Sequence, residues 1–160
     1  INLARARFPA GTTGNQLDPL ARFNLWQDSK DYDHGTGHGV GSFLSVHEGP
    51  VSISKRAQMQ PLLPGMILSN EPGYYKEGKY GIRIENLVLV QQLLKNSNFL
   101  HFKTLTLAPI DKNLIDFKML TYPEKKWLHD YHQEVYEKLV AKLSQSEKKW
   151  LSNVVNSYIC

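Results

Sequence analysis

Cysteine is nearly absent from this sequence, and so are long apolar runs and any strong excess of charge. The single cysteine among 160 residues is Cys160, so no disulfide can form within the chain. No apolar run approaches the roughly 20 residues that a membrane-spanning helix needs, and no charged and apolar leader opens the chain. The formal net charge is only +4. We therefore expect a cytoplasmic protein with no membrane partner and no nucleic-acid partner.

The composition that remains is typical of a globular protein. Hydrophobic residues make up 41% and charged residues 21% of the chain, which predicts one ordinary domain with an appendage. The chain starts at Ile1 rather than at Met. We expect it to be a piece of a longer protein.

The first part of the chain is predicted to fold into a helix followed by extended segments. Asp18 followed by Pro19 is a typical helix start, and apolar residues at helical spacing predict a helix from Pro19 to Gln27. Alternate glycines make a helix improbable around His34 and His38, so an extended backbone is expected there. A strand is predicted from Ser42 to His47, ended by a turn at Glu48-Gly49-Pro50.

Three further strands and two helices are predicted beyond this point. Met66 to Leu68 form a buried run that places Asn70 and Glu71 at its end, Gly81–Val90 is rich in β-branched residues, and Phe99–Leu107 follows an Asn/Ser turn. Thr121 is a cap candidate for an amphipathic helix of about 20 residues, with Pro123 in its first turn. A shorter helix begins near Ser146.

The stretch from His34 to Pro50, HGTGHGVGSFLSVHEGP, holds three histidines, five glycines and one carboxylate. Fixing so much glycine is entropically costly, so the stretch is interpreted as one wall of an active site. Period-two alternation places Arg83 and Glu85 on one face of the Gly81–Val90 strand. We expect four polar side chains to point to the inner face of the fold, with two histidines nearby: His38, Glu71, Arg83 and Glu85, and beside them His34 and His47.

Buried carboxylates need an arginine, a metal ion or each other. Oxygen ligands with one imidazole suit Mn, Zn, Co or Fe. Each residue also has a structural alternative. A histidine in a glycine loop often serves only as a hydrogen-bonding turn residue, Arg83 and Glu85 could form a plain ion pair, and Glu71 could cap the turn at Pro72.

Two segments, HGTGHGVGSFLSVHEGP and LLPGMILSNEPGYYKEGKYGIRIENLVLV, resemble the C-terminal half of the catalytic domain of Xaa-Pro aminopeptidases. These are pita-bread metallopeptidases, a group that also includes prolidase and methionine aminopeptidase. The resemblance implies an α+β fold, with a curved antiparallel sheet and helices over residues 1–111. It also implies a helical tail over residues 112–160 that contributes to a homodimer of the full-length protein.

The resemblance also implies a role for each candidate residue. His38 matches a metal-ligating histidine, Glu71 a terminal glutamate ligand and Glu85 a glutamate that bridges two ions. His34 and His47 match histidines that contact substrate, and Arg83 an arginine that orients a carboxylate. Two divalent ions, Mn²⁺ with Zn²⁺ or Co²⁺ as alternatives, would hold a hydroxide that attacks the carbonyl before proline in a peptide with an Xaa-Pro N-terminus.

The chain also departs from the family pattern. Two aspartate ligands of the family precede the histidine motif, and Asp18, Asp28, Asp31 and Asp33 match neither of them. The resemblance thus implies three of five ligands, and we expect the isolated chain to hydrolyse nothing. The alternatives are a peptidase of the prolidase or methionine aminopeptidase type, and a pita-bread module that binds without catalysis.

Overall fold

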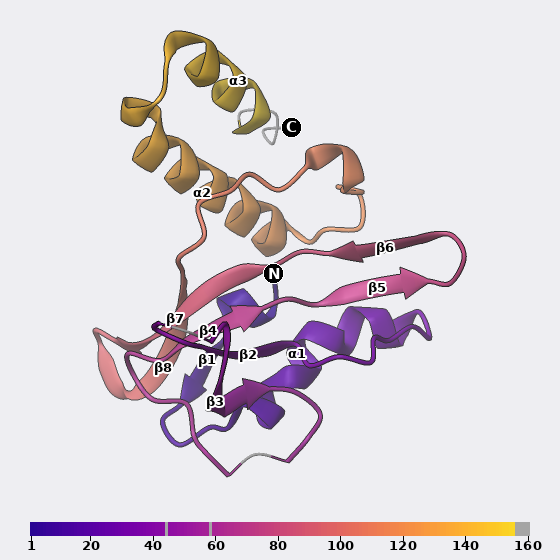
Figure 1. Cartoon of the computed structure of the whole chain (residues 1–160), viewed down its shortest axis with the longest axis vertical. Coiled ribbons are helices and arrows are strands. Elements are labelled where there is room, and N and C mark those ends of the chain that lie inside the picture. The colour runs from indigo at the N-terminus through magenta and orange to yellow at the C-terminus, as the bar shows by residue number, and fades with distance from the viewer. Residues whose placement is uncertain (44, 58, 156–160) are drawn as a thin grey trace. The chain divides into compact units, whose positions relative to one another are not determined.

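The computed structural model of the chain describes residues 1–43, 45–57 and 59–155, and Figure 1 shows their helices and strands. The chain forms two compact units. The sheet unit comprises Asn2–Thr106, and the helical unit comprises Leu107–Cys160 together with Ile1. Cys160 itself lies outside the described residues. Within the described parts, no helix combines the length and the apolar character that crossing a membrane requires.

The sheet unit is built on antiparallel strands. Its described residues form a six-stranded sheet in the order β1-β8-β7-β4-β2-β3 and a separate two-stranded sheet of β5 and β6. The strands are β1 (Arg7–Pro9), β2 (Gly37–Val40), β3 (His47–Ile53), β4 (Ile67–Asn70), β5 (Gly73–Lys76), β6 (Tyr80–Arg83), β7 (Asn86–Leu93) and β8 (Asn96–Thr104). With the helices of the chain, they confirm the predicted α+β class.

Helix α1 (Gly14–Gln27) covers one face of the sheet and closes the core. Leu17 of the helix is buried against strand residues such as Phe8 and Ile53. Phe8 and Phe102 pack with ring centroids 5.0 Å apart, and Val88 and Val90 of β7 are fully buried. Strand alternation thus sends one side of β7 into the core.

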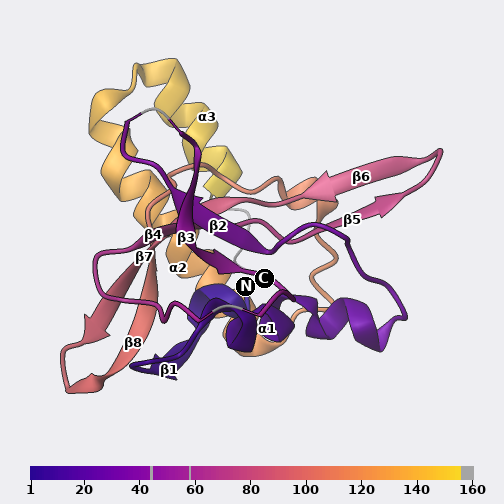
Figure 2. The ribbon, with the colours of Figure 1, turned by 60° about the horizontal axis from the view of Figure 1, so that its bottom comes forward.

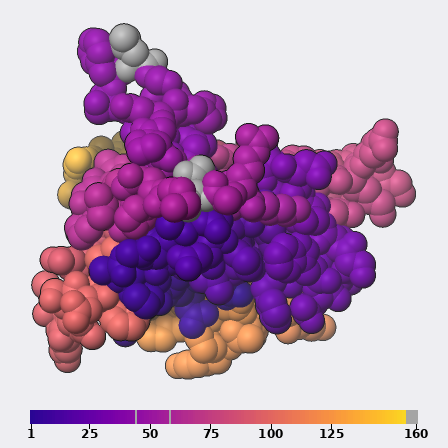
Figure 3. All heavy atoms as spheres, turned by 90° about the horizontal axis from the view of Figure 1, so that it is seen from below, coloured from indigo at the N-terminus to yellow at the C-terminus, as the bar shows by residue number. Residues whose placement is uncertain are grey.

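The β5–β6 hairpin extends away from the six-stranded sheet (Figure 2). In the space-filling view it forms a projection, as does the chain between β2 and β3 (Figure 3). Phe43 and Val46, between β2 and β3, are 90% and 69% exposed. Large apolar side chains therefore face solvent in this chain near the histidine motif.

The start of α1 differs from the prediction. The helix begins at Gly14, because Thr13 and Gln16 form a capping box in which the Thr13 N–H donates to Gln16 Oε1 at 2.8 Å. Pro19 therefore lies inside the helix, where its ring removes one backbone donor. Asp18 is not a cap but a buried side chain.

Two strand predictions were also wrong in their bounds. The strand expected at Ser42–His47 lies instead at His47–Ile53, and it includes the residues expected to form a turn. Gly81–Val90 is not one strand but the end of β6 and the start of β7. The break falls at Ile84 and Glu85, because β6 pairs with β5 whereas β7 pairs with β4 and β8.

Other predictions are confirmed. Strand β4 ends at Asn70 and so places Glu71 directly after it. Strand β8 overlaps the strand expected at Phe99–Leu107, and the extended backbone expected around His38 is β2.

Two glycines of β2 allow the backbones of neighbouring strands to approach closely. A Cβ on Gly37 would lie 2.0 Å from the Ser69 carbonyl oxygen, and one on Gly39 would lie 2.1 Å from the Glu48 carbonyl oxygen. No side chain fits either position.

In the helical unit, helix α2 (Tyr122–Leu139) starts as predicted. Thr121 and Glu124 form a capping box, and Pro123 lies in the first turn. Helix α3 (Gln145–Val155) follows. The two helices bury an apolar cluster that contains Val135, Leu151 and Val155.

Polar contacts tie α2 to the segment that precedes it. The Tyr131 hydroxyl donates to the Ala108 carbonyl at 2.7 Å, and His132 Nε2 accepts the Ile110 N–H at 3.0 Å. His132 is fully buried. Burial, which disfavours the charged imidazolium, lowers the pKa of His132 to about 4.

Candidate metal centre

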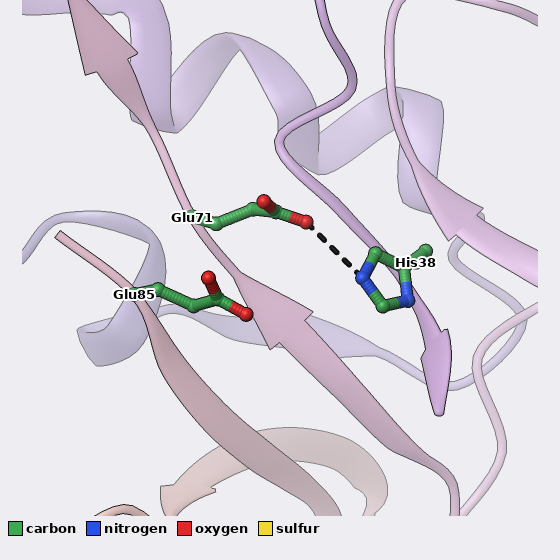
Figure 4. A group of neighbouring side chains, drawn as sticks. All are labelled: His38, Glu71 and Glu85. Atoms are coloured by element: carbon green, nitrogen blue, oxygen red, sulfur yellow. Dashed lines mark ion pairs between the residues drawn. The ribbon is translucent and has the colours of Figure 1, made fainter. Parts of the chain in front are cut away.

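Three predicted ligands meet where adjacent strands end. His38 lies on β2, Glu71 follows β4 and Glu85 precedes β7. Strand β4 is hydrogen-bonded to both β2 and β7, which brings the three side chains together from distant parts of the sequence. Their ligand atoms all lie within 4.8 Å of one another, and Figure 4 shows the side chains converging.

The His38 ring is oriented with one nitrogen toward the carboxylates. His38 Nδ1 lies 2.9 Å from the Gly39 carbonyl oxygen, which can only accept, so Nδ1 carries the hydrogen. In the neutral ring, Nε2 then presents a lone pair 3.3 Å from Glu71 Oε1 (Figure 4). Two acceptors that face each other this closely favour a cation or a proton between them. Metal-bound histidines commonly have this arrangement.

Glu71 is held firmly although it lies outside the strand. Its residue exposure is 9%. The Ser69 hydroxyl donates to Glu71 Oε1 at 2.9 Å and accepts the His38 N–H at 3.0 Å. Arg83 Nη1 lies 3.5 Å from Glu71 Oε2. One serine thus connects two of the candidate ligands, and an arginine balances the buried carboxylate.

The donor set fits a divalent metal ion. One imidazole nitrogen with carboxylate oxygens is the ligand chemistry of Mn²⁺, Zn²⁺ or Co²⁺, and an ion there would satisfy the facing lone pairs of His38 and Glu71.

A second chain of hydrogen bonds joins His34 to Arg83 through Tyr75. His34 Nδ1 donates to the Gly35 carbonyl at 2.8 Å, so Nε2 is the acceptor of the Tyr75 hydroxyl, also at 2.8 Å. Arg83 Nε donates to the same hydroxyl oxygen at 2.8 Å. This bond raises the pKa of Arg83. Nothing in the sequence predicted that Tyr75 would bridge these two residues.

His47 completes the predicted set. It lies at the start of β3, with its ring centroid 4.1 Å from that of His38. The expected inward orientation is wrong for Arg83 and Glu85, which are exposed, and His47 is exposed as well. Arg83 ends the separate β5–β6 hairpin and Glu85 lies between β6 and β7, so neither belongs to the six-stranded sheet that encloses the core.

Sequence reasoning missed a buried network beneath the histidine motif. Arg22 of α1 is 1% exposed, and its Nε donates to Asp18 Oδ2 at 2.6 Å. Its other nitrogens donate to Asp31 Oδ1 at 2.7 Å, to the Tyr32 carbonyl at 2.6 Å and to the His34 carbonyl at 2.9 Å. The guanidinium also lies 3.8 Å from the centre of the Tyr32 ring.

Asp31 forms the outer edge of this network. Burial raises the pKa of Asp31, but hydrogen bonds from Lys55 and Arg22 outweigh it and hold that pKa well below its usual value. The four-residue spacing of Asp18 and Arg22 was visible in the sequence, but the same spacing is common in solvent-exposed pairs.

Two family descriptions match the chain. The one for metallopeptidase family M24 covers residues 1–92, and the one for the C-terminal region of peptidase M24 covers residues 98–158.

Curated relatives are similar over nearly the whole chain. A probable Xaa-Pro aminopeptidase P of Coprinopsis cinerea is 52% identical over 94% of this chain and 25% of its own length. One of Fusarium vanettenii is 54% identical over 86% of this chain and 23% of its own length. The chain therefore spans about a quarter of the length of these relatives.

A solved structure supports the same relationship. The X-prolyl aminopeptidase of Caenorhabditis elegans, described as a cytosolic enzyme with a di-nuclear active site, matches with a TM-score of 0.90. It is 44% identical over 96% of this chain and 26% of its own length. The prolidase of Pyrococcus furiosus matches with a TM-score of 0.52 and 33% identity over 66% of this chain and 29% of its own length. The fold is thus the expected pita-bread architecture, and the chain belongs to metallopeptidase family M24.

Proposed function

We propose that this chain carries part of the active site of a metal-dependent aminopeptidase that removes the first residue from peptides with proline in second position. The observation that carries the proposal is the convergence of His38, Glu71 and Glu85, whose ligand atoms lie within 4.8 Å of one another. The names of the curated relatives and of the Caenorhabditis elegans structure support the substrate class.

In this proposal His38 and Glu71 would hold divalent ions, and Glu85 would be a ligand shared between them. Such ions would supply Lewis-acid chemistry at this place. We propose Mn²⁺ as the resident ion, with Zn²⁺ and Co²⁺ as alternatives that the donor set also fits.

The remaining residues bind and orient the reacting groups. Arg83 orients Glu71, since its guanidinium lies 3.5 Å from the carboxylate. His34 and His47 contact the substrate. His34 also exchanges a proton at Nε2, the atom that is hydrogen-bonded to the Tyr75 hydroxyl.

We further infer that residues 1–160 alone hydrolyse no peptide, because three ligand side chains are too few to hold two ions. The full-length protein, meaning the polypeptide that contains this chain, is the active species. We propose that it is cytoplasmic, since its Caenorhabditis elegans relative is described as cytosolic. We also propose a homodimer to which residues 112–160 contribute.

The test compares three substrates of the full-length protein: an Xaa-Pro-Xaa tripeptide, an Xaa-Pro dipeptide and a peptide that begins Met-Ala. Cleavage of the tripeptide that is lost with a chelator and restored by Mn²⁺ is the expected result. Exclusive cleavage of the dipeptide would instead indicate a prolidase, and cleavage of the Met-Ala peptide a methionine aminopeptidase. No hydrolysis of any substrate would indicate a binding module.

A further inference from the structure

Thr36 is the residue where the buried network meets the metal centre. It is fully buried between His34 and His38. Its hydroxyl donates to Asp18 Oδ1 at 2.6 Å, and its carbonyl oxygen accepts the Glu71 N–H at 2.7 Å. One residue therefore contacts α1 through its side chain and a candidate ligand through its backbone.

Each of the two candidate ligand residues makes a backbone bond outside the strand ladders. Strand β4 ends at Asn70, so the amide of Glu71 is held by Thr36 and not by β7. The amide of His38 is held by the Ser69 hydroxyl. A metal site needs its ligands fixed within about 0.5 Å. At Glu71 that rigidity must come from outside the strand ladders, and at His38 the Ser69 bond adds to the pairing of His38 with Ser52 of β3.

The Asp18–Arg22 ion pair is better suited to holding the backbone near the candidate ligands in place than to raising the stability of the fold. Both side chains are 1% exposed. A buried ion pair contributes little net stability because desolvation offsets the attraction. Its geometry, however, is strongly constrained: Arg22 bonds two carboxylates and two carbonyls, one of them that of His34. The bonds of α1 thus fix the backbone on both sides of Tyr32 and leave Asp18 Oδ1 for Thr36.

We propose that the Asp18–Arg22 ion pair is a positioning device for the metal centre, and that it acts through Thr36 on the backbone at His38 and Glu71. The inference rests on the proposed function in one respect, namely that the centre binds divalent ions. These residues do not touch substrate, and their role is to hold the ligands in place.

The experiment compares two substitutions of Thr36 in the full-length protein. Thr36→Val keeps the shape of the side chain but removes the hydroxyl that Asp18 accepts, whereas Thr36→Ser keeps the hydroxyl. The Mn²⁺ dissociation constant is measured by titration calorimetry on metal-free protein. We expect affinity to fall about 10-fold or more in Thr36→Val, as for other partners that orient metal ligands, and to stay at the wild-type value in Thr36→Ser.

A matched control separates positioning from general destabilisation. Val90→Ala opens the buried core of β7 and leaves every side chain of the network in place; Val90 is 0% exposed. It should lower the melting temperature of the metal-free protein without changing the Mn²⁺ affinity. If Thr36→Val does not fold, Tyr32→Phe replaces it, because the Tyr32 hydroxyl hydrogen-bonds the same Thr36 oxygen. The expected weakening is then smaller but in the same direction.

Two results would overturn the positioning role: wild-type Mn²⁺ affinity in the folded hydroxyl-deficient variant, or an equal loss of affinity in Val90→Ala. Failure of the proposed function looks different. A wild-type protein that binds Mn²⁺ but cleaves no Xaa-Pro peptide overturns the peptidase assignment and leaves the affinity comparison valid. A wild-type protein that binds no Mn²⁺ overturns both.

Discussion

The sheet unit and the helical unit bury polar groups for different reasons. Among the described residues of Asn2–Thr106 the buried polar ones are Asp18, Arg22, Thr36, Ser69, Asn70, Glu71 and Asn86, and several are linked into one system around His38. In the described part of the helical unit they are Glu124 and His132. Glu124 caps a helix and His132 accepts a backbone N–H. Buried polarity thus organises a site in one unit and serves local structure in the other.

The largest change should be a loss of activity on substitution of Glu71 in the candidate metal centre. Glu71→Gln in the full-length protein removes a proposed ligand and the ion-pair partner of Arg83, and we expect kcat/KM on an Xaa-Pro tripeptide to fall on the order of 10³-fold. Hydrogen exchange over Tyr122–Val155 should stay unchanged. Residual activity above a tenth of wild type would remove Glu71 from the proposed machinery.

Truncation of a buried apolar side chain should instead destabilise the helical unit. Leu151 is 1% exposed in the α2–α3 cluster, so Leu151→Ala should destabilise that unit by about 2–4 kcal/mol through lost burial and a cavity. Faster hydrogen exchange in peptides from α2 and α3, with peptides from β4 and β7 unaffected, is the expected readout. Equal acceleration in both sets would mean that the two units unfold together.

Acid should act on the helical unit through His132. Burial lowers its folded pKa to about 4 from 6.5, so between these values the unfolded chain binds a proton that the folded chain excludes. Stability is fully present above pH 6.5 and falls as the pH drops toward 4. At pH 5 the loss relative to pH 8 is about 2 kcal/mol.

The measurement is pH-corrected hydrogen exchange of α2 peptides at pH 5 and pH 8, with His132→Gln as the control. The variant should lose the difference between the two pH values, even if it is less stable at both. An unchanged difference would assign the acid sensitivity to another group.

The smallest effect should come from the capping boxes, of which each unit has one at the start of a helix. Thr121 and Thr13 each open a capping box, with N–H to side-chain distances of 2.8 Å in both. Replacing either by Ala should cost about 1 kcal/mol, seen as faster exchange in the first turn of the corresponding helix. Because Thr13 begins the helix that carries Arg22, Thr13→Ala should also weaken Mn²⁺ binding slightly, whereas Thr121→Ala should not.

The sequence was sufficient to predict the residues with distinctive chemistry. His38, Glu71 and Glu85 were predicted to lie together because two buried carboxylates at strand positions need an arginine, a metal ion or each other, and because the surrounding motifs resemble a known family. The α+β class followed from the resemblance to that family, and helix α2 followed from periodicity and from the cap at Thr121.

The buried network was not predictable by the same reasoning. Asp18 followed by Pro19 has the pattern of a helix start, and the competing signal, Thr13 with Gln16, was overlooked. Whether Arg22 is buried depends on acceptors from Asp31 to His34, which only the folded chain brings together. The division of Gly81–Val90 likewise depends on strand partners and not on the composition of the segment.

The bare positions of β2 also limit how this site can vary. Since backbone oxygens of β4 and β3 occupy the places where side chains at Gly37 and Gly39 would lie, sequence change on one side of the strand is closed off entirely. A substitution scan of this strand should therefore show that tolerance to side chains alternates along it, with only glycine accepted at positions 37 and 39, directly before and after His38. His38 thus lies between two glycines whose lack of a side chain lets the neighbouring strands approach closely.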